Sequence, residues 1–205
     1  MSLITVNNPT SATAEAYRAL RTNLHFAALE APIKTLLITS PSQQEQGDVM
    51  ATNLAVSLAQ IEKSVILVDA NARQPILAGL LGLSNSTGLL NLLAEPTLTL
   101  AAVLQQSAVP GLRLLSSGTL AQSASDLISS PRMTTLIQLL TTQADFVIFY
   151  APAILTASDS AMLASQVDAV MLAIQVDKTR RDDAQQAKEI LIRAKARLLG
   201  AVMLH

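Results

Sequence analysis

The segment ITSPSQQEQGDVMATNLA, residues Ile38–Ala55, decides the fold of this 205-residue chain. It follows a short apolar run, Lys34–Ile38, whose composition is typical of a strand. In its second half, apolar residues recur at roughly helical spacing, as at Val49, Leu54 and Leu58. A strand, a tight loop and a helix in this order form the setting of a phosphate-binding loop in α/β proteins.

The loop inside this segment lacks most of the residues that phosphate binding needs. Such a loop uses glycines so that backbone N–H groups can surround the phosphates, a lysine for charge, and a serine or threonine for magnesium. Gly47 is the only glycine before Gly79, and Asp48 follows it directly. We interpret Asp48 as a cap of the following helix, with a carboxylate that accepts the N–H groups a phosphate would otherwise take.

Composition excludes several classes of function. Apolar residues make up 50% of the chain and charged residues 14%, which argues against disorder. The net charge of −1 gives no electrostatic case for a nucleic-acid partner. There is no cysteine, and the two histidines, His25 and His205, form no metal-ligand cluster, so we expect no metal site. No apolar run approaches the roughly 20 residues of a membrane-spanning helix.

Strands that alternate with helices predict a three-layer α/β fold, a parallel sheet covered by helices on both faces. We expect one domain over 1–205: an arm at 1–10, an N-terminal helix at 11–30 with Ser11 as its N-cap, and an α/β core at 34–205. The strands predicted in the core are 34–40, 65–69, 112–115, 145–150, 169–176 and 198–204. The later helices are predicted near 75–81 and 87–93, at 131–142 with Ser130 as cap, and at 158–164 and 179–197.

Binding sites in parallel sheets lie beyond the carboxyl ends of the strands. Four groups of residues are predicted to lie at that edge. They are the loop after Ser40, Asp69 with Asn71, Tyr150 with Pro152, and Asp177 with Lys178.

Several segments together resemble the cytoplasmic domain of bacterial tyrosine kinases, the BY-kinases. The most specific are Ser130–Met133, Val68–Pro75 and Lys178–Arg181, and the resemblance covers nearly the whole chain. The family belongs to the P-loop ATPases with variant Walker motifs, and it serves exopolysaccharide and capsule synthesis. The resemblance implies a P-loop NTPase-like fold and a cytoplasmic location. Contact with the inner face of the plasma membrane would be made through a partner or a transmembrane segment outside this chain.

The departures from the family are concentrated where the family does its chemistry. Family members carry a loop close to Gly-Pro-Gly-Glu-Gly-Lys-Ser/Thr across Ser42–Asp48. Here the glycine positions hold Ser42, Gln44 and Gln46, the lysine position holds Gly47, and the magnesium-binding hydroxyl is replaced by Asp48. A lost cation and an added anion beside phosphate, each interacting by roughly 4 kcal/mol at about 4 Å, would lower nucleotide affinity at least about a hundredfold.

The second and third motifs of the family are altered as well. The second keeps Asp69 but has Asn71 where a second aspartate is usual, and the third, normally Asp-Thr-Pro-Pro, begins with Tyr150. We interpret Asp69 as a residual strand-end carboxylate and expect the Tyr150 ring to fill the site. All these positions are therefore treated as vestigial, and we expect no catalytic residue and no cofactor.

One motif of the family is intact. Glu15, Arg18 and Arg21 fit the Glu-x2-Arg-x2-Arg pattern that resembles the ring-forming interface of BY-kinases, and their spacing places them on one helical face. A carboxylate and two guanidinium groups suit bidentate pairing across subunits. The alternative is an ordinary solvated face. The resemblance implies a homo-oligomer, or a hetero-oligomer with an active relative, together with a membrane polysaccharide co-polymerase as partner.

These observations leave two main hypotheses. The first is a catalytically inactive, kinase-like domain that assembles with a partner in exopolysaccharide synthesis and chain-length control. The second is an active tyrosine kinase or ATPase that binds ATP and magnesium at an unconventional site, with Asp69, Lys178 and Arg180 supplying the electrostatics. A third hypothesis, a ParA-like or MinD-like positioning ATPase, is disfavoured by the same missing lysine.

Overall fold

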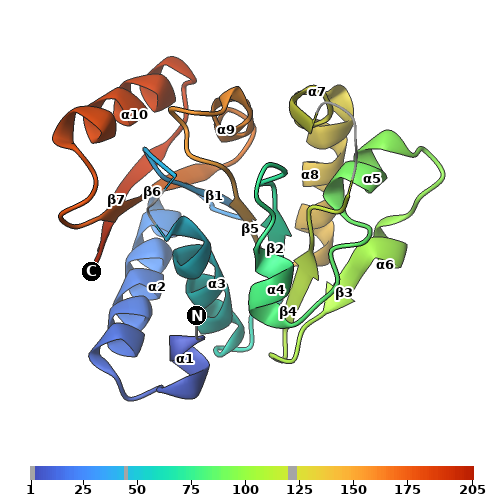
Figure 1. Cartoon of the computed structure of the whole chain (residues 1–205). Helices are drawn as coiled ribbons and strands as arrows, with labels where there is room; N and C mark the ends of the chain where they lie inside the picture. The colour runs from blue at the N-terminus through green and yellow to red at the C-terminus, as the bar shows by residue number, and fades with distance from the viewer. Residues whose placement is uncertain (1–2, 44–45, 120–123) are drawn as a thin grey trace.

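A seven-stranded sheet forms the centre of the computed structural model, which describes residues 3–43, 46–119 and 124–205. The strand order is β3-β4-β2-β5-β1-β6-β7 (Figure 1). The strands are β1 (Thr35–Thr39), β2 (Val65–Asp69), β3 (Leu104–Gln106), β4 (Leu112–Leu115), β5 (Phe146–Tyr150), β6 (Ala169–Gln175) and β7 (Leu198–Leu204). Every neighbouring pair is parallel except β3 and β4. The parallel sheet predicted from the sequence is thus correct apart from this one antiparallel edge strand.

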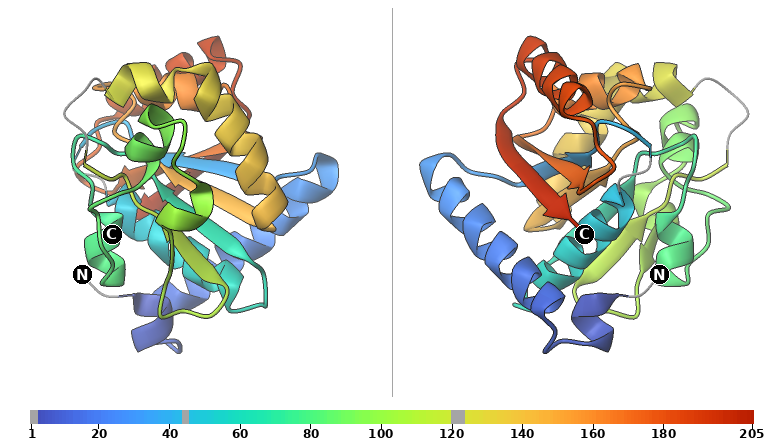
Figure 2. Two further views of the ribbon diagram at one scale, coloured as in Figure 1. Left: turned by 90° about the vertical axis from the view of Figure 1, so that its right-hand side faces the viewer. Right: turned by 60° about the vertical axis from the view of Figure 1, so that its left-hand side comes forward.

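Helices cover both faces of the sheet, which makes three layers (Figures 1 and 2). On one side lie α1 (Ile4–Asn7), α2 (Ala12–Glu30), α3 (Gly47–Ala59) and α4 (Leu77–Leu81). The other helices are α5 (Leu89–Ala94), α6 (Leu100–Val103), α7 (Ala124–Ile128), α8 (Pro131–Gln143), α9 (Ser158–Ala164) and α10 (Arg181–Arg193). No helix in the described ranges combines the length and the apolar character that crossing a membrane requires.

The continuous apolar strands are explained by this double cover. Leu36 and Ile38 of β1 pack toward α2 and α3, whereas Leu37 between them belongs to the core on the opposite face. Successive side chains of a strand point to opposite faces, so a strand buried on both sides is apolar at every position. All five residues of β1, and all five of β2, are buried.

Several predicted boundaries differ from the structure. The last helix ends at Arg193 instead of reaching residue 197, because Lys195 adopts a left-handed conformation with φ of 55°. The N–H of Ala196 then donates to the carbonyl of Leu191, as in a Schellman helix end. Glycine is the usual residue at such a position, so the sequence carried no stop signal there.

Two local features differ in detail from what the sequence suggested. Residues 1–10 were expected to be an arm, but Ile4–Asn7 form the short helix α1, and Thr5 donates from its backbone N–H and its hydroxyl to Oδ1 of Asn53 in α3. Ser130 precedes α8, as expected, but its hydroxyl donates to the carbonyl of Leu127 and caps no N–H of the helix. By contrast, Ser11 does cap α2, because its Oγ accepts from the N–H of Ala14 at 3.1 Å.

Candidate functional site

A small polar cavity lies where the loops after β1, β2 and β5 meet, at the carboxyl edge predicted from the sequence. Its volume is about 40 Å³, and it is lined by Ser40, Gln43, Gln46, Gly47, Asp48, Asn71, Arg73, Gln74, Tyr150, Pro152 and Ala153. This is the place that the family's phosphate loop would occupy. One water molecule needs about 10–15 Å³ of such space, so a volume of about 40 Å³ holds a few water molecules. Ligand sites for drug-sized molecules span about 300–1,000 Å³.

The ring of Tyr150 packs against Gly47 and narrows the cavity. A Cβ atom added to Gly47 would lie 3.3 Å from Cε2 of Tyr150 and 3.6 Å from Cβ of Ala173. A side chain at position 47 would therefore require the ring to shift by a few tenths of an ångström. Burial raises the pKa of Tyr150 to about 12, with Asp48 and Asp69 adding to the rise and the Asn71 hydrogen bond opposing it, so the phenol stays neutral.

Asp48 does not cap α3 in the way that the sequence suggested. It lies in the first turn of that helix, where its charge is favourable to the helix dipole, and it is buried, with 7% of its surface exposed. Within residues 3–43, 46–119 and 124–205, however, no hydrogen bond or ion pair reaches its carboxylate. The reason is positional: Gln46 is the residue preceding the helix, and Asp48 stands too far inside it to act as an N-cap.

Asp69 has a structural role that the sequence did not reveal. Its carboxylate is fully buried at the end of β2. Oδ2 accepts from the N–H groups of Ile76 and Leu77, both at 3.0 Å, and Oδ1 accepts from the N–H of Asn71 at 3.1 Å. The side chain thus fixes the loop between β2 and α4. Three of its roughly four acceptor positions are therefore taken by the backbone of this loop.

We expect the stability of the protein to fall as the pH rises through the titration of Asp69. Burial, only partly offset by the three backbone hydrogen bonds, raises the pKa of Asp69 from 3.8 to about 6. The folded state therefore holds more protons than the unfolded state between about pH 4 and pH 6. The free energy of unfolding should decrease over that window by up to about 3 kcal/mol and level off above it.

Urea denaturation at about pH 5 and pH 7.5 measures this effect. An Asp69→Asn variant should show a flatter pH dependence, and an equal slope in the two proteins would contradict the assignment. Asp145 does not confuse the comparison, since hydrogen bonds from Ser64 lower the pKa of this exposed carboxyl. Its contribution has the opposite sign and is lost only at lower pH.

The loop before α3 contains a residue in the left-handed region of backbone conformation. Gln46 has a φ of 41°, although it is not a glycine. Ser40 donates from Oγ to the carbonyl of Ser42 at 2.8 Å. Gln44 and Glu45 lie outside the described residues. Gln46 thus holds a backbone conformation that glycine adopts more readily.

The remaining residues differ in whether they line the cavity and in whether the sequence had singled them out. Asn71 lines the cavity, and its Nδ2 donates to the hydroxyl of Tyr150 at 3.4 Å. Lys178 and Arg180 follow β6 and are not among the described residues that line the cavity. Arg73 and Gln43 do line it but were not singled out from the sequence. Their positions in the loops that follow β2 and β1, at the carboxyl edge of the sheet, could have indicated them.

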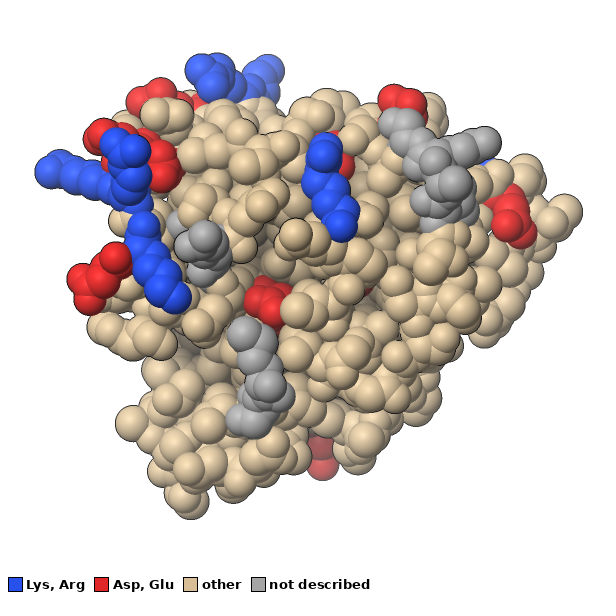
Figure 3. Space-filling view, in the orientation of Figure 1, with Lys and Arg blue, Asp and Glu red and all other residues tan. Residues whose placement is uncertain are grey.

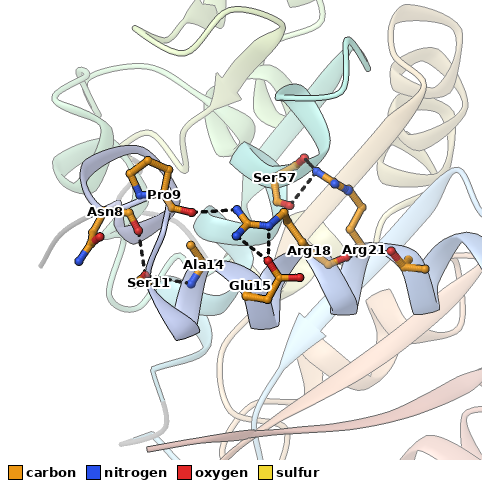
Figure 4. Close-up of polar contacts among 9 residues, drawn as sticks. Asn8, Pro9, Ser11, Ala14, Glu15, Arg18, Arg21 and Ser57 are labelled. Carbon is orange, nitrogen blue, oxygen red and sulfur yellow. Dashed lines mark hydrogen bonds and ion pairs between the residues drawn. The ribbon is translucent and has the colours of Figure 1, made fainter.

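The Glu-x2-Arg-x2-Arg motif makes contacts within its own chain (Figure 4). Arg18 pairs with Glu15 at 2.6 Å and donates to the carbonyl of Pro9 at 2.9 Å. Arg21 donates to the carbonyl of Ser57 at 2.6 Å and to its hydroxyl at 3.2 Å. Because α3 ends at Ala59, that carbonyl belongs to the last turn of the helix, which a cation stabilises. The hydrogen bonds of Arg21 therefore join α2 to the C-terminal end of α3.

An Arg21→Met variant should lower the free energy of unfolding by about 1–2 kcal/mol, since it keeps the aliphatic stem and loses both hydrogen bonds to Ser57. Arg18→Met is the matched control on the same helix, and its exposed ion pair should be worth less than about 1 kcal/mol. Urea denaturation of the two variants tests this ranking. Equal losses would contradict the internal role of Arg21.

The sheet topology and the loop after β1 define the class of protein: an α/β fold of the P-loop NTPase type with variant Walker motifs. The septum site-determining protein MinD of Pyrococcus horikoshii, solved with Mg-ADP, has a similar fold with a TM-score of 0.69. The two chains are 21% identical, and the match covers 83% of this chain and 69% of that one. At this level of identity the likeness concerns the fold alone.

Closer relatives are tyrosine kinases. The chain is 35% identical to the tyrosine-protein kinase YwqD of Bacillus subtilis over 202 residues, which cover 98% of this chain and 85% of that protein. It is 32% identical to the tyrosine-protein kinase wzc of Salmonella typhi over 83% of this chain and 24% of that protein. The kinase domain of the Escherichia coli tyrosine kinase ETK superposes with a TM-score of 0.94 at 28% identity, covering 99% of this chain and 79% of that one. No family model matches the chain.

The chain therefore belongs to the bacterial tyrosine kinase family, as its motifs suggested.

Proposed function

We propose that this chain is a catalytically inactive BY-kinase domain that serves as an assembly or regulatory component in exopolysaccharide synthesis and chain-length control. The observation that supports the proposal most directly is the occupied phosphate position: the Tyr150 ring lies against Gly47, and the cavity beside it measures about 40 Å³. The carboxylate of Asp48 lines the same cavity, where the family has a magnesium-binding hydroxyl.

The alternative, an active kinase or ATPase with an unconventional site, needs Asp69, Lys178 and Arg180 to act together. Asp69 is held by three backbone N–H groups, and the two cations lie outside the lining of the cavity. These contacts favour the inactive form. The functional role in the cell then depends on partners: a second copy, an active relative, or a membrane polysaccharide co-polymerase at the inner face of the plasma membrane.

Isothermal titration with Mg-ATP, combined with a phosphate-release assay, tests the loss of activity. We expect no saturable binding up to about 1 mM nucleotide, because the Asp48 carboxylate repels phosphate and the loop from Ser42 to Asp48 has no lysine to offset it. Binding tighter than about 10 µM together with phosphate release would reject the proposal in favour of the active alternative.

We further propose that Glu15, Arg18 and Arg21 contribute to an interface between subunits. The Glu15 side chain is 69% exposed and that of Arg18 is 37% exposed, so this pair can contact a second protein. Arg21 is already bound to Ser57, so its part in an interface is to hold α2 in position.

Size-exclusion chromatography with light scattering tests the interface. If the parent is oligomeric, the double variant Arg18→Ala with Arg21→Ala should lower its measured mass. Arg18→Ala alone should also lower the mass, and it keeps the contacts of Arg21 with Ser57. Glu30→Gln, at the exposed end of the same helix, is the control. An unchanged mass in both Arg variants would reject the interface. A parent that is monomeric at about 100 µM would contradict self-assembly. Assembly would then be tested by mixing the chain with an active relative.

A further inference from the structure

The altered phosphate position has the features of a site for a positively charged group. We propose that it binds a primary alkylammonium group, the chemical group of a lysine side chain, with Asp48 as its counter-ion. The inference goes beyond the loss of nucleotide binding, since it assigns a ligand class of opposite charge to the same edge of the sheet.

The first observation is the state of Asp48. The residue as a whole is only 7% exposed and lines the cavity, where its carboxylate meets solvent, and no described side chain or backbone group bonds to that carboxylate. Buried charges in proteins are normally paired or hydrogen-bonded, because an unpaired one loses its hydration without compensation. Figure 3 shows acidic surface in the middle of the face that is turned to the viewer, apart from the mixed charges over α10.

The second observation is the shape and chemistry around that carboxylate. The cavity of about 40 Å³ shares Gln43, Gln46, Asp48, Asn71, Gln74 and Tyr150 with an open groove of about 450 Å³. Side-chain amides and the Ser40 hydroxyl offer acceptors near the carboxylate. The groove adds Pro75 and Ile76, and Ile76 is 40% exposed. An ammonium head fits the polar cavity, and a methylene stem fits the apolar part of the groove.

The number of available charges favours a monovalent ligand over a divalent metal ion. Of the two carboxylates Asp48 and Asp69 at this edge, that of Asp48 receives no hydrogen bond or ion pair from the described residues, whereas Asp69 is bound by three N–H groups and fully buried. The described part of the chain also contains no group of three His, Cys, Asp or Glu residues that could hold a metal. Arg73 lines the same cavity and is exposed, and no ion pair joins it to Asp48. Its guanidinium is a competitor for the incoming ammonium.

NMR titration of the full chain with n-butylammonium chloride tests the proposal, at an ionic strength of about 20 mM to limit screening. The side-chain amide signals of Gln43, Gln46 and Asn71 should shift saturably, with a dissociation constant of about 10 mM or tighter. 1-Butanol, which has the same stem without the charge, should produce no such shift. Nα-acetyl-lysine-N-methylamide distinguishes the source: binding at least as tight as butylammonium indicates a peptide-borne lysine, and weaker binding indicates a free amine.

Three variants complete the test. Asp48→Asn keeps the shape of the side chain and should weaken butylammonium binding at least about tenfold, whereas Glu95→Gln removes an equal charge at an exposed position and should leave binding unchanged. Arg73→Gln should tighten binding several-fold, because the competitor is gone. Unchanged binding in Asp48→Asn, equal shifts with butanol, or no saturable shift up to about 100 mM would each overturn the proposal. None of these readouts depends on Mg-ATP or on oligomeric state, so a failure here is distinct from a failure of the proposed function.

Discussion

Restoring Lys at position 47 alone should leave Mg-ATP binding undetectable at about 1 mM, whereas the combination Gly47→Lys, Asp48→Ser and Tyr150→Asp should raise affinity at least about a hundredfold. The single lysine meets the Tyr150 ring 3.3 Å from its Cβ position, and its charge would be taken up by the neighbouring Asp48. The triple variant removes the ring, replaces repulsion by attraction toward phosphate, and returns a hydroxyl for magnesium. Each exchange of charge is worth roughly 4 kcal/mol at about 4 Å and an effective dielectric constant of about 20.

Isothermal titration measures this difference, and thermal denaturation confirms that the variants fold. Gly79→Lys is the matched control, because it adds the same net charge as the triple variant at a glycine with no neighbouring atom within 4 Å of its Cβ position. If the triple variant folds but binds no nucleotide, the non-glycine residues of the loop, such as Ser42 and Gln46, would be what prevents nucleotide binding. Tight binding by the single variant would refute the role assigned to Tyr150 and Asp48.

Replacing Asp69 by alanine should lower the free energy of unfolding by about 2–4 kcal/mol at neutral pH. The variant leaves the N–H groups of Asn71, Ile76 and Leu77 without their acceptor at the buried end of β2. Removal of a buried carboxylate recovers part of this loss, since its charged form is costly to bury. The net effect stays large because three donors are left unpaired at once.

Chemical denaturation provides the measurement, with Glu189→Ala as the control. Glu189 is exposed on α10, and its replacement should change stability by less than about 0.5 kcal/mol. A loss in Asp69→Ala no greater than that of the control would show that Asp69 is a vestige without structural value. The original interpretation, a residual strand-end carboxylate, would then be sufficient.

The candidate site was predictable as a set of missing groups. The sequence shows directly that the segment from Ser42 to Asp48 has a single glycine, Gly47, and no lysine, and that Tyr150 ends the strand 145–150. The contacts at this edge were predictable only in part. The Tyr150 ring was expected to fill the site, and its contact with Gly47 joins residues far apart in the chain. The three bonds to Asp69 come from the loop that follows it, and the unpaired carboxylate of Asp48 depends on the exact start of α3, and neither was expected.

By itself, the sequence determined the α/β architecture and most of its elements. The runs 65–69, 112–115 and 198–204, and the helix 158–164, agree with the structure to the residue, because apolar runs bounded by turn residues mark buried strands and helices locally. Only the tertiary structure decided the rest. Strand β3 is half-exposed and partly polar, and it is a strand because β4 pairs with it. Arg21, proposed from the sequence as an interface residue, also joins α2 to α3, because folding places the last turn of α3 within its reach.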